Sequence, residues 1–218
     1  RDIINHDYNK VNPVTKSLAI EALGNIPDQK LPNEVFAGLF HPDQLLSGAA
    51  AKVLIKRNDE AGMKYLKDGK LLPVELVKLL QEHHEVPLVV LDRIYYFMRL
   101  PVFRKITRSL LLPMARGFEP MHFKTGQLSD LRPFYNKAFV VFSGDISISD
   151  GLLERKLARH QMFVDGIHFD LDQCELIEMS DAVVLVCDHA KFISLASGFQ
   201  EMLPNLIERS EAEVIEVN

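Results

Sequence analysis

Residues Ala138–Gly151, with the sequence AFVVFSGDISISDG, contain the clearest structural pattern in this chain. The first part is a run of β-prone apolar residues. The second part alternates isoleucine with aspartate and serine, which is typical of a half-buried strand. The segment ends in Asp150-Gly151, a dipeptide that strongly favours a tight turn between antiparallel strands. We therefore expect two successive strands followed by a hairpin.

β-prone residues also lie on both sides of this segment. They are Met121, Phe123, Leu176-Ile177 and Ala182–Val186, and Val214 and Ile215 add a short stretch near residue 218. Asp188 stands where it would cap a helix that carries Phe192 and Leu195. Because the strands are short and separated by turn signals, the pattern favours an antiparallel barrel or sandwich flanked by helices.

The first 90 residues have helical spacing instead. Helices are expected after Asn12-Pro13, from Leu31, after His41-Pro42, after Asn58-Asp59 and from Leu71. Ala19, Ala22 and Leu23 recur 31 positions later as Ala50, Val53 and Leu54. Proline followed by Ala-x-x-Ala-Leu resembles HEAT repeats, which implies an α-solenoid. An unrelated helical bundle is the alternative. The predicted domains are therefore residues 1–90, helical, and residues 91–218, a barrel with flanking helices.

The composition is that of a folded globular protein. Of 218 residues, 47% are hydrophobic and 25% are charged, with a net charge of −5. This charge argues against nucleic-acid binding. Cys174 and Cys187 lie in apolar segments, so we expect reduced core residues and not a disulfide framework. No apolar run approaches the roughly 20 residues of a membrane helix. Since the chain begins at Arg1, we expect it to be a soluble piece of a larger protein.

Residues Leu91–Leu206 resemble the cyclic-nucleotide-binding-domain family. Four pieces carry the resemblance in order: the helical segment Leu91–Leu111, the turn Phe123-Lys124-x-Gly126, the core Ala138–Gly151, and Val183–Cys187 followed by Phe192, Leu195 and Pro204. The family fold is a jelly roll flanked by helices, and the resemblance implies that fold here. An unrelated small barrel, such as a cupin-like one, is the alternative.

The family's phosphate-binding cassette begins Gly-Asp-x-Phe-Gly-Glu, and an Arg follows about ten residues later. The resemblance places Gly166, His168, Phe169, Asp170 and Leu171 in this frame. Asp170 then replaces the second Gly. Leu171 replaces the Glu that accepts a ribose hydroxyl, and the Arg that pairs with the cyclic phosphate is absent.

The charges around the cassette frame also argue against binding of a cyclic nucleotide. From His160 to Ala190 the sequence has no Lys or Arg, but it has seven acidic residues: Asp165, Asp170, Asp172, Glu175, Glu178, Asp181 and Asp188. An anionic ligand would be repelled there. We therefore expect no cyclic nucleotide and no cofactor.

Other kinds of chemistry fit the sequence less well. Asp165, His168, Asp170 and Asp172 form the best metal-ligand set, but a solvated acidic loop explains them more simply, and no metal is expected. Walker, Rossmann and nucleophile-elbow motifs are absent, so an enzyme is not expected. The basic and aromatic residues between Arg93 and Arg116 are interpreted as an interdomain helix, with a peripheral adaptor for anionic surfaces as the alternative.

The sequence thus predicts a non-catalytic regulatory or protein-interaction module. The domain order resembles the soluble C-terminal region of bacterial ATP/ADP-translocase-like transporters. This resemblance implies a cytoplasmic tail near the inner membrane, whose partners are other parts of the parent protein or another protein. The alternative function is a sensor whose barrel binds a different, uncharged or cationic small molecule. The oligomeric state is left open.

Overall fold

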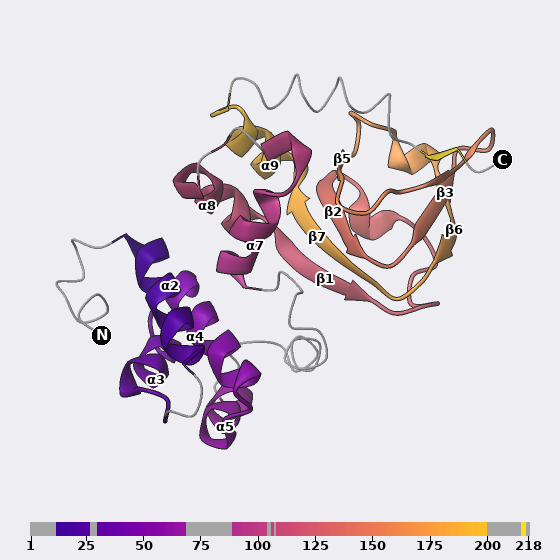
Figure 1. Cartoon of the computed structure of the whole chain (residues 1–218). Helices are drawn as coiled ribbons and strands as arrows, with labels where there is room; N and C mark the ends of the chain where they lie inside the picture. The colour runs from indigo at the N-terminus through magenta and orange to yellow at the C-terminus, as the bar shows by residue number, and fades with distance from the viewer. Residues whose placement is uncertain are drawn as a thin grey trace. The chain divides into compact units, whose positions relative to one another are not determined.

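The computed structural model describes residues 12–26, 30–68, 89–103, 106, 108–199 and 215–216 (Figure 1). The chain divides into two units, Arg1–Tyr95 and Tyr96–Asn218, and each is described by itself. Helix α7 (Val90–Phe97) crosses this division, and its last two residues belong to the second unit.

The first unit is helical. Its elements are α2 (Pro13–Gly24), α3 (Asn33–Leu39), α4 (Gln44–Lys56), α5 (Glu60–Asp68) and the first part of α7. Short polar side chains cap the beginnings of three of these helices. The Asn12 side chain accepts a hydrogen bond from the Val14 amide of α2 at 2.8 Å, and the Asp43 side chain accepts one from the Leu45 amide of α4 at 3.0 Å. The Asp59 side chain accepts one from the Gly62 amide of α5 at 2.8 Å. Each cap satisfies an amide that has no partner within its helix. The helix predicted from Leu71 lies outside the described residues.

Helices α2 and α4 run side by side in the same direction. Three polar contacts join them, and each links residues 31 positions apart: Lys52 to Glu21, Lys56 to Asn25, and Arg57 to the carbonyl of Ile26. An antiparallel pair would not keep this offset constant. The offset equals the spacing of the recurring Ala-x-x-Ala/Val-Leu pattern, so equivalent residues of the two segments lie opposite one another.

Close packing accompanies this pairing. A Cβ atom at Gly24 would lie 2.3 Å from a methyl carbon of Val53, and one at Gly62 would lie 2.5 Å from Leu54. Ile20, Leu39, Leu45, Leu54 and Leu66 are fully buried in the unit. The helices therefore meet through small residues that allow close approach of their backbones.

The second unit contains two four-stranded sheets in which all paired strands are antiparallel. The order β1-β7-β2-β5 comprises Glu119–Phe123, Ala182–Asp188, Lys137–Ser143 and Met162–Val164. The order β6-β3-β4-β8 comprises Glu175–Met179, Ile146–Ser149, Glu154–Lys156 and Ile215–Glu216. Mixed helices and antiparallel sheets, as in a jelly roll, confirm the predicted fold class at this level.

The two sheets share one apolar core. Phe123, Phe134, Phe139, Phe163 and Phe169 form a continuous chain of ring contacts, with consecutive centroids 5.1 to 5.8 Å apart. The predicted strand pair and hairpin are present as β2, β3 and β4. Between β2 and β3 the backbone of Gly144 has φ +87°, and a Cβ there would lie 2.4 Å from the Asp181 carbonyl oxygen. Glycine is therefore required where the chain leaves one sheet for the other.

Helices cover one end of the barrel unit. They are η1 (Pro101–Phe103), α8 (Arg108–Gly117) and α9 (His189–Ala196). Phe118 stacks edge-on against Phe97 at 5.2 Å and against Phe192 at 6.1 Å, so aromatic rings join α7, the end of α8 and α9. Asp188 precedes α9 as expected, but its side chain makes no capping bond, because the carboxylate pairs with Lys137 across β2 and β7.

The predicted helical turn at Leu206-Ile207 lies outside the described residues. Within them, no helix combines the length and the hydropathy that crossing a membrane requires.

Candidate functional site

The candidate site is the loop that joins β5 to β6, where the resemblance places the cassette. A tight turn opens it: the amide of Gly166 donates to the Phe169 carbonyl at 2.9 Å, and the amides of Ile167 and His168 donate to Val164. Gly166 has φ +77°, a left-handed conformation that glycine adopts easily. A 3-10 turn, η3 (Leu171–Gln173), then leads into β6.

Asp165 holds this loop to the barrel. Its Oδ2 accepts from the Asn136 amide at 2.7 Å, and its Oδ1 accepts from the Leu171 amide at 2.9 Å. Its own amide donates to the Lys137 carbonyl at 3.0 Å. Both carboxylate oxygens therefore serve as structural acceptors for backbone groups.

His168 is also used internally. Its Nδ1 lies 3.1 Å from the Val164 amide, and its ring contacts Phe163 and Phe169 at centroid distances of 5.9 and 6.3 Å. Burial lowers the pKa of His168, and the hydrogen bond with Val164 opposes that shift. The imidazole is a half-buried packing group of the loop.

The remaining predicted site residues separate into two sets. Phe169 and Leu171 are buried in the barrel core, and Leu171 is fully inaccessible. Gly166, Asp170 and Asp172 face solvent. The structure thus brings Asp165, His168 and Phe169 together, but it turns Asp170 and Asp172 away from the core. Among the described residues, no three His, Cys, Asp or Glu side chains are grouped so as to hold a metal ion.

The electrostatic field near the loop is acidic. Burial raises the pKa of Cys174, the residue just before β6, and the carboxylates of Asp150, Asp165 and Asp170 raise it further. Arg155 opposes them, but it is engaged in an ion pair with Asp150 at 3.0 Å. A thiolate is disfavoured at Cys174, first by burial and then by these carboxylates.

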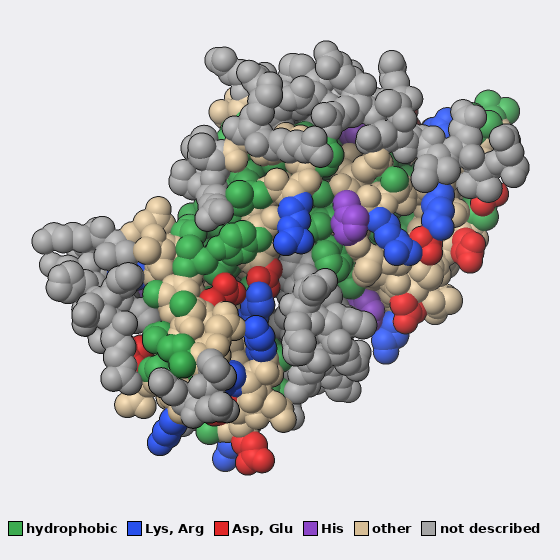
Figure 2. All heavy atoms as spheres, in the orientation of Figure 1, with side chains coloured by type: hydrophobic (Ala, Val, Ile, Leu, Met, Phe, Trp, Pro, Cys, Tyr) green, Lys and Arg blue, Asp and Glu red, His purple; other side chains and the backbone are tan. Residues whose placement is uncertain are grey.

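Charges elsewhere on the visible surface are mixed. Figure 2 shows Lys and Arg interspersed with Asp and Glu among the described residues. On the β3–β4 hairpin, for example, Asp145 lies 3.0 Å from Lys156 and 2.9 Å from Arg159. Such exposed pairs stabilise local structure only modestly.

The sequence did not single out three residues that position this side of the barrel. The Tyr96 hydroxyl lies 3.0 Å from Nδ1 of His160, and Phe142 packs edge-on against both rings at 5.1 and 5.9 Å. His160 has φ +63°, which is unusual for a residue with a side chain. A histidine between Arg159 and Gln161 carries no local signal for this conformation, so the sequence alone would not reveal it.

Solved structures align with this chain at low identity and low TM-score. A cAMP-binding acyltransferase from Mycobacterium smegmatis aligns at TM-score 0.41 and 14% identity, over 53% of this chain and 39% of that one. The C-linker/CNBHD of zELK channels, crystallised in the presence of cAMP, aligns at TM-score 0.41 and 10% identity. The alignment covers 72% of this chain and 94% of the channel fragment.

A third structure is described by a cyclic-GMP-dependent signalling pathway that regulates bacterial phytopathogenesis. It aligns at TM-score 0.36 and 20% identity, and the alignment covers 49% of this chain and 91% of that chain. The present chain thus spans well under half the length of the acyltransferase. No protein-family model matches the sequence, and no curated protein matches it.

Proposed function

We propose that this chain is a non-catalytic regulatory or protein-interaction module of a larger protein, with a cyclic-nucleotide-binding-like barrel that does not bind a cyclic nucleotide. The observation that carries the proposal is the use of Asp165. Both of its oxygens accept from the amides of Asn136 and Leu171, so its carboxylate serves the barrel's own backbone. The acidic surroundings and the absence of Lys and Arg from His160 to Ala190 support the same conclusion.

The frame of the cassette does not alter this proposal. A second alignment of Gly-Asp-x-Phe-Gly-Glu begins at His160, whose left-handed backbone suits a glycine position, and puts Phe163 at the aromatic position. The second glycine then becomes Val164, which is fully buried, and the glutamate becomes the shorter Asp165. In the first frame Leu171 replaces the glutamate. In the second frame Asp165 replaces it and already accepts hydrogen bonds from two backbone amides, and in neither frame does an arginine follow before Ala190.

The helical unit fits a role in protein interaction. The constant offset of 31 residues between contacting side chains of α2 and α4 supports a repeat architecture, and we propose that it is HEAT-like. Repeat arrays present extended surfaces to partners. By its resemblance in domain order to ATP/ADP-translocase-like transporters, we place the module on the cytoplasmic side of such a parent.

Isothermal titration calorimetry of the full chain with cAMP and cGMP tests the proposal. We expect no binding heat at ligand concentrations that saturate an intact cyclic-nucleotide-binding domain measured in parallel. Micromolar binding of either nucleotide would overturn it.

The alternative function is a sensor for an uncharged or cationic molecule. Burial is the main cause of the raised pKa of Cys174, but the carboxylates of Asp150, Asp165 and Asp170 add to it, and these acidic groups favour a neutral or cationic ligand over an anion. A thermal-shift screen with metabolites and metal ions distinguishes the two functions. A saturable rise in Tm with a cationic or neutral compound supports the sensor, and no rise supports the interaction module.

A further inference from the structure

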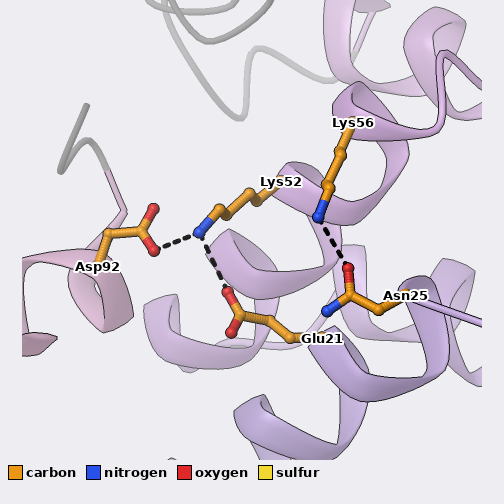
Figure 3. A network of polar contacts seen from close by, with 5 residues as sticks. All are labelled: Glu21, Asn25, Lys52, Lys56 and Asp92. Carbon is orange, nitrogen blue, oxygen red and sulfur yellow. Dashed lines mark hydrogen bonds and ion pairs between the residues drawn. The ribbon is translucent and has the colours of Figure 1, made fainter. Parts of the chain in front are cut away.

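A polar cluster in the helical unit places one cation between two carboxylates. Lys52 of α4 reaches Glu21 of α2 at 3.4 Å and contacts Asp92 of α7 on its other side (Figure 3). The side chains of Lys52, Glu21 and Asp92 are only 24%, 19% and 13% exposed. One ammonium group therefore joins three helices in a poorly hydrated place.

The charges of this cluster do not balance. With all three groups ionised the cluster carries one net negative charge, and burial makes that charge costly. Oδ1 of Asp92 contacts Lys52, but its Oδ2 is buried and has no hydrogen-bond partner among the described residues. A carboxylate oxygen in that situation is better accommodated when the group holds a proton.

The electrostatics of the neighbouring groups agree with this geometry. Burial raises the pKa of Asp92 from 3.8 to about 6, and Glu21 raises it as well, whereas Lys52 and Arg93 lower it. For Lys52, burial lowers the pKa, but the two carboxylates outweigh burial and raise it overall. The ammonium therefore stays charged, and Asp92 is the group of this cluster that titrates near neutral pH.

We propose that Asp92 acts as a proton-dependent latch, whose protonated form holds α7 against α2 and α4 more firmly than its ionised form. A carboxyl group whose pKa is raised by folding contributes stability that is complete below its ordinary pKa of 3.8. This contribution is lost as the pH rises through about 6. The latch is therefore tight in mild acid and weak above neutral pH.

Asp92 lies on the same helix as a residue that contacts the barrel. One helical turn later, Tyr96 of the same helix bonds to His160 in the barrel unit. The proton on Asp92 thus affects how firmly the first part of α7 is held within the helical unit. This inference concerns the helical unit and does not depend on what the barrel binds.

The test uses the full chain, labelled with ¹³C and ¹⁵N. We expect the Asp92 carboxyl carbon to titrate near pH 6, and the α7 amides to exchange more slowly below that pH than above it, after correction for intrinsic exchange. Glu21→Gln should shift the Asp92 titration to lower pH, because it removes a repelling carboxylate. Asp92→Asn should abolish the rise in α7 protection below about pH 6. Any pH dependence that remains should have the opposite sign, because protonation of His160 weakens its contact with Tyr96 of α7.

The matched control is Asp130→Asn, because Asp130 forms an exposed ion pair with Arg132. This variant should leave the α7 profile unchanged. Titration of Asp92 near its ordinary value, or the same pH profile in Asp92→Asn as in the wild type, would overturn the proposal. If Asp92→Asn fails to fold, the wild-type titration and the Glu21→Gln shift still decide it.

Discussion

The hydroxyl group of Tyr96 lies 3.0 Å from Nδ1 of His160, and this contact joins the end of α7 to the barrel across 64 residues of sequence. Phe142 packs against both rings, so one hydrogen bond and three aromatic contacts converge at this point. The same histidine has a left-handed backbone conformation, with φ +63°.

We predict that Tyr96→Phe destabilises the protein by about 0.5–1.5 kcal/mol at pH 8, because it removes the hydrogen bond and keeps the rings. Burial, and then Arg159, lower the pKa of His160, which favours the neutral ring beside the Tyr96 hydroxyl. Stability from this ring is present above its ordinary pKa and is lost as the pH falls through the lowered value. The destabilisation should therefore shrink at pH 5.

Urea unfolding of wild type, Tyr96→Phe, His160→Asn and the double variant measures the coupling of this pair. Asn is chosen because it tolerates the left-handed backbone of His160. Additive effects of the two substitutions at pH 8 would contradict the prediction.

Asp165→Ala should destabilise the barrel by about 1–3 kcal/mol, because the Leu171 amide loses its acceptor in a half-buried position. The Asn136 amide is exposed, so water replaces the carboxylate there at little cost. Denaturant unfolding followed by circular dichroism measures the change. Asp170→Ala, an exposed neighbour, is the control and should change stability by less than about 0.5 kcal/mol. If Asp165→Ala and Asp170→Ala lowered stability equally, the structural role of the Asp165 carboxylate would be contradicted.

Gly24→Ala should destabilise the helical unit by about 1–3 kcal/mol, since the added methyl group would overlap Val53. Val53→Ala alone should also destabilise the unit, because it leaves a cavity. In combination the smaller Val53→Ala side chain makes room for the methyl group. The double variant should therefore lose less stability than the sum of the single variants, as thermal unfolding can measure. Strict additivity would indicate that the two helices do not approach so closely.

Both cysteines should react slowly with a thiol reagent at pH 8. Burial raises the pKa of Cys187 to about 11, and burial together with nearby carboxylates raises that of Cys174. Few thiolates are then present, and the sulfur atoms are covered. Labelling monitored by mass spectrometry should be complete within minutes in concentrated urea and much slower in buffer. Rapid native labelling at Cys187 would show that β7 is accessible.

Local pattern was enough to predict many elements of the fold. The alternation of Ile146 and Ile148 with polar residues predicts β3, and Asp150-Gly151 predicts the turn into β4, because these features depend on neighbours in sequence. The caps at Asn12 and Asp59 are predictable for the same reason. The repeat offset of 31 residues also appears in the sequence, although the direction of packing between α2 and α4 does not.

Long-range partners could not be predicted. Asp165 looks like any other acidic loop residue, and its structural role depends on the Asn136 amide, 29 positions away. Asp188 looks like a helix cap, but Lys137 of the neighbouring strand attracts its carboxylate. Asp92 has an ordinary helical context, and only Lys52, 40 positions earlier, reveals its environment. In each case the local sequence allows several hydrogen-bond or ion-pair partners for the charged side chain, and the tertiary fold determines which partner it contacts.

The constant offset between α2 and α4 also bears on how this chain can change in length. The three polar contacts described above connect equivalent positions, but the two partners differ chemically: Lys52 meets Glu21, and Lys56 meets Asn25. A tandem copy of the α4 segment alone would therefore place a second lysine opposite Lys52, and like charges repel. An added segment of the same period would fit only if it carried an acceptor where α4 carries Lys52. The interface between α2 and α4 thus limits which segments can be stacked on it.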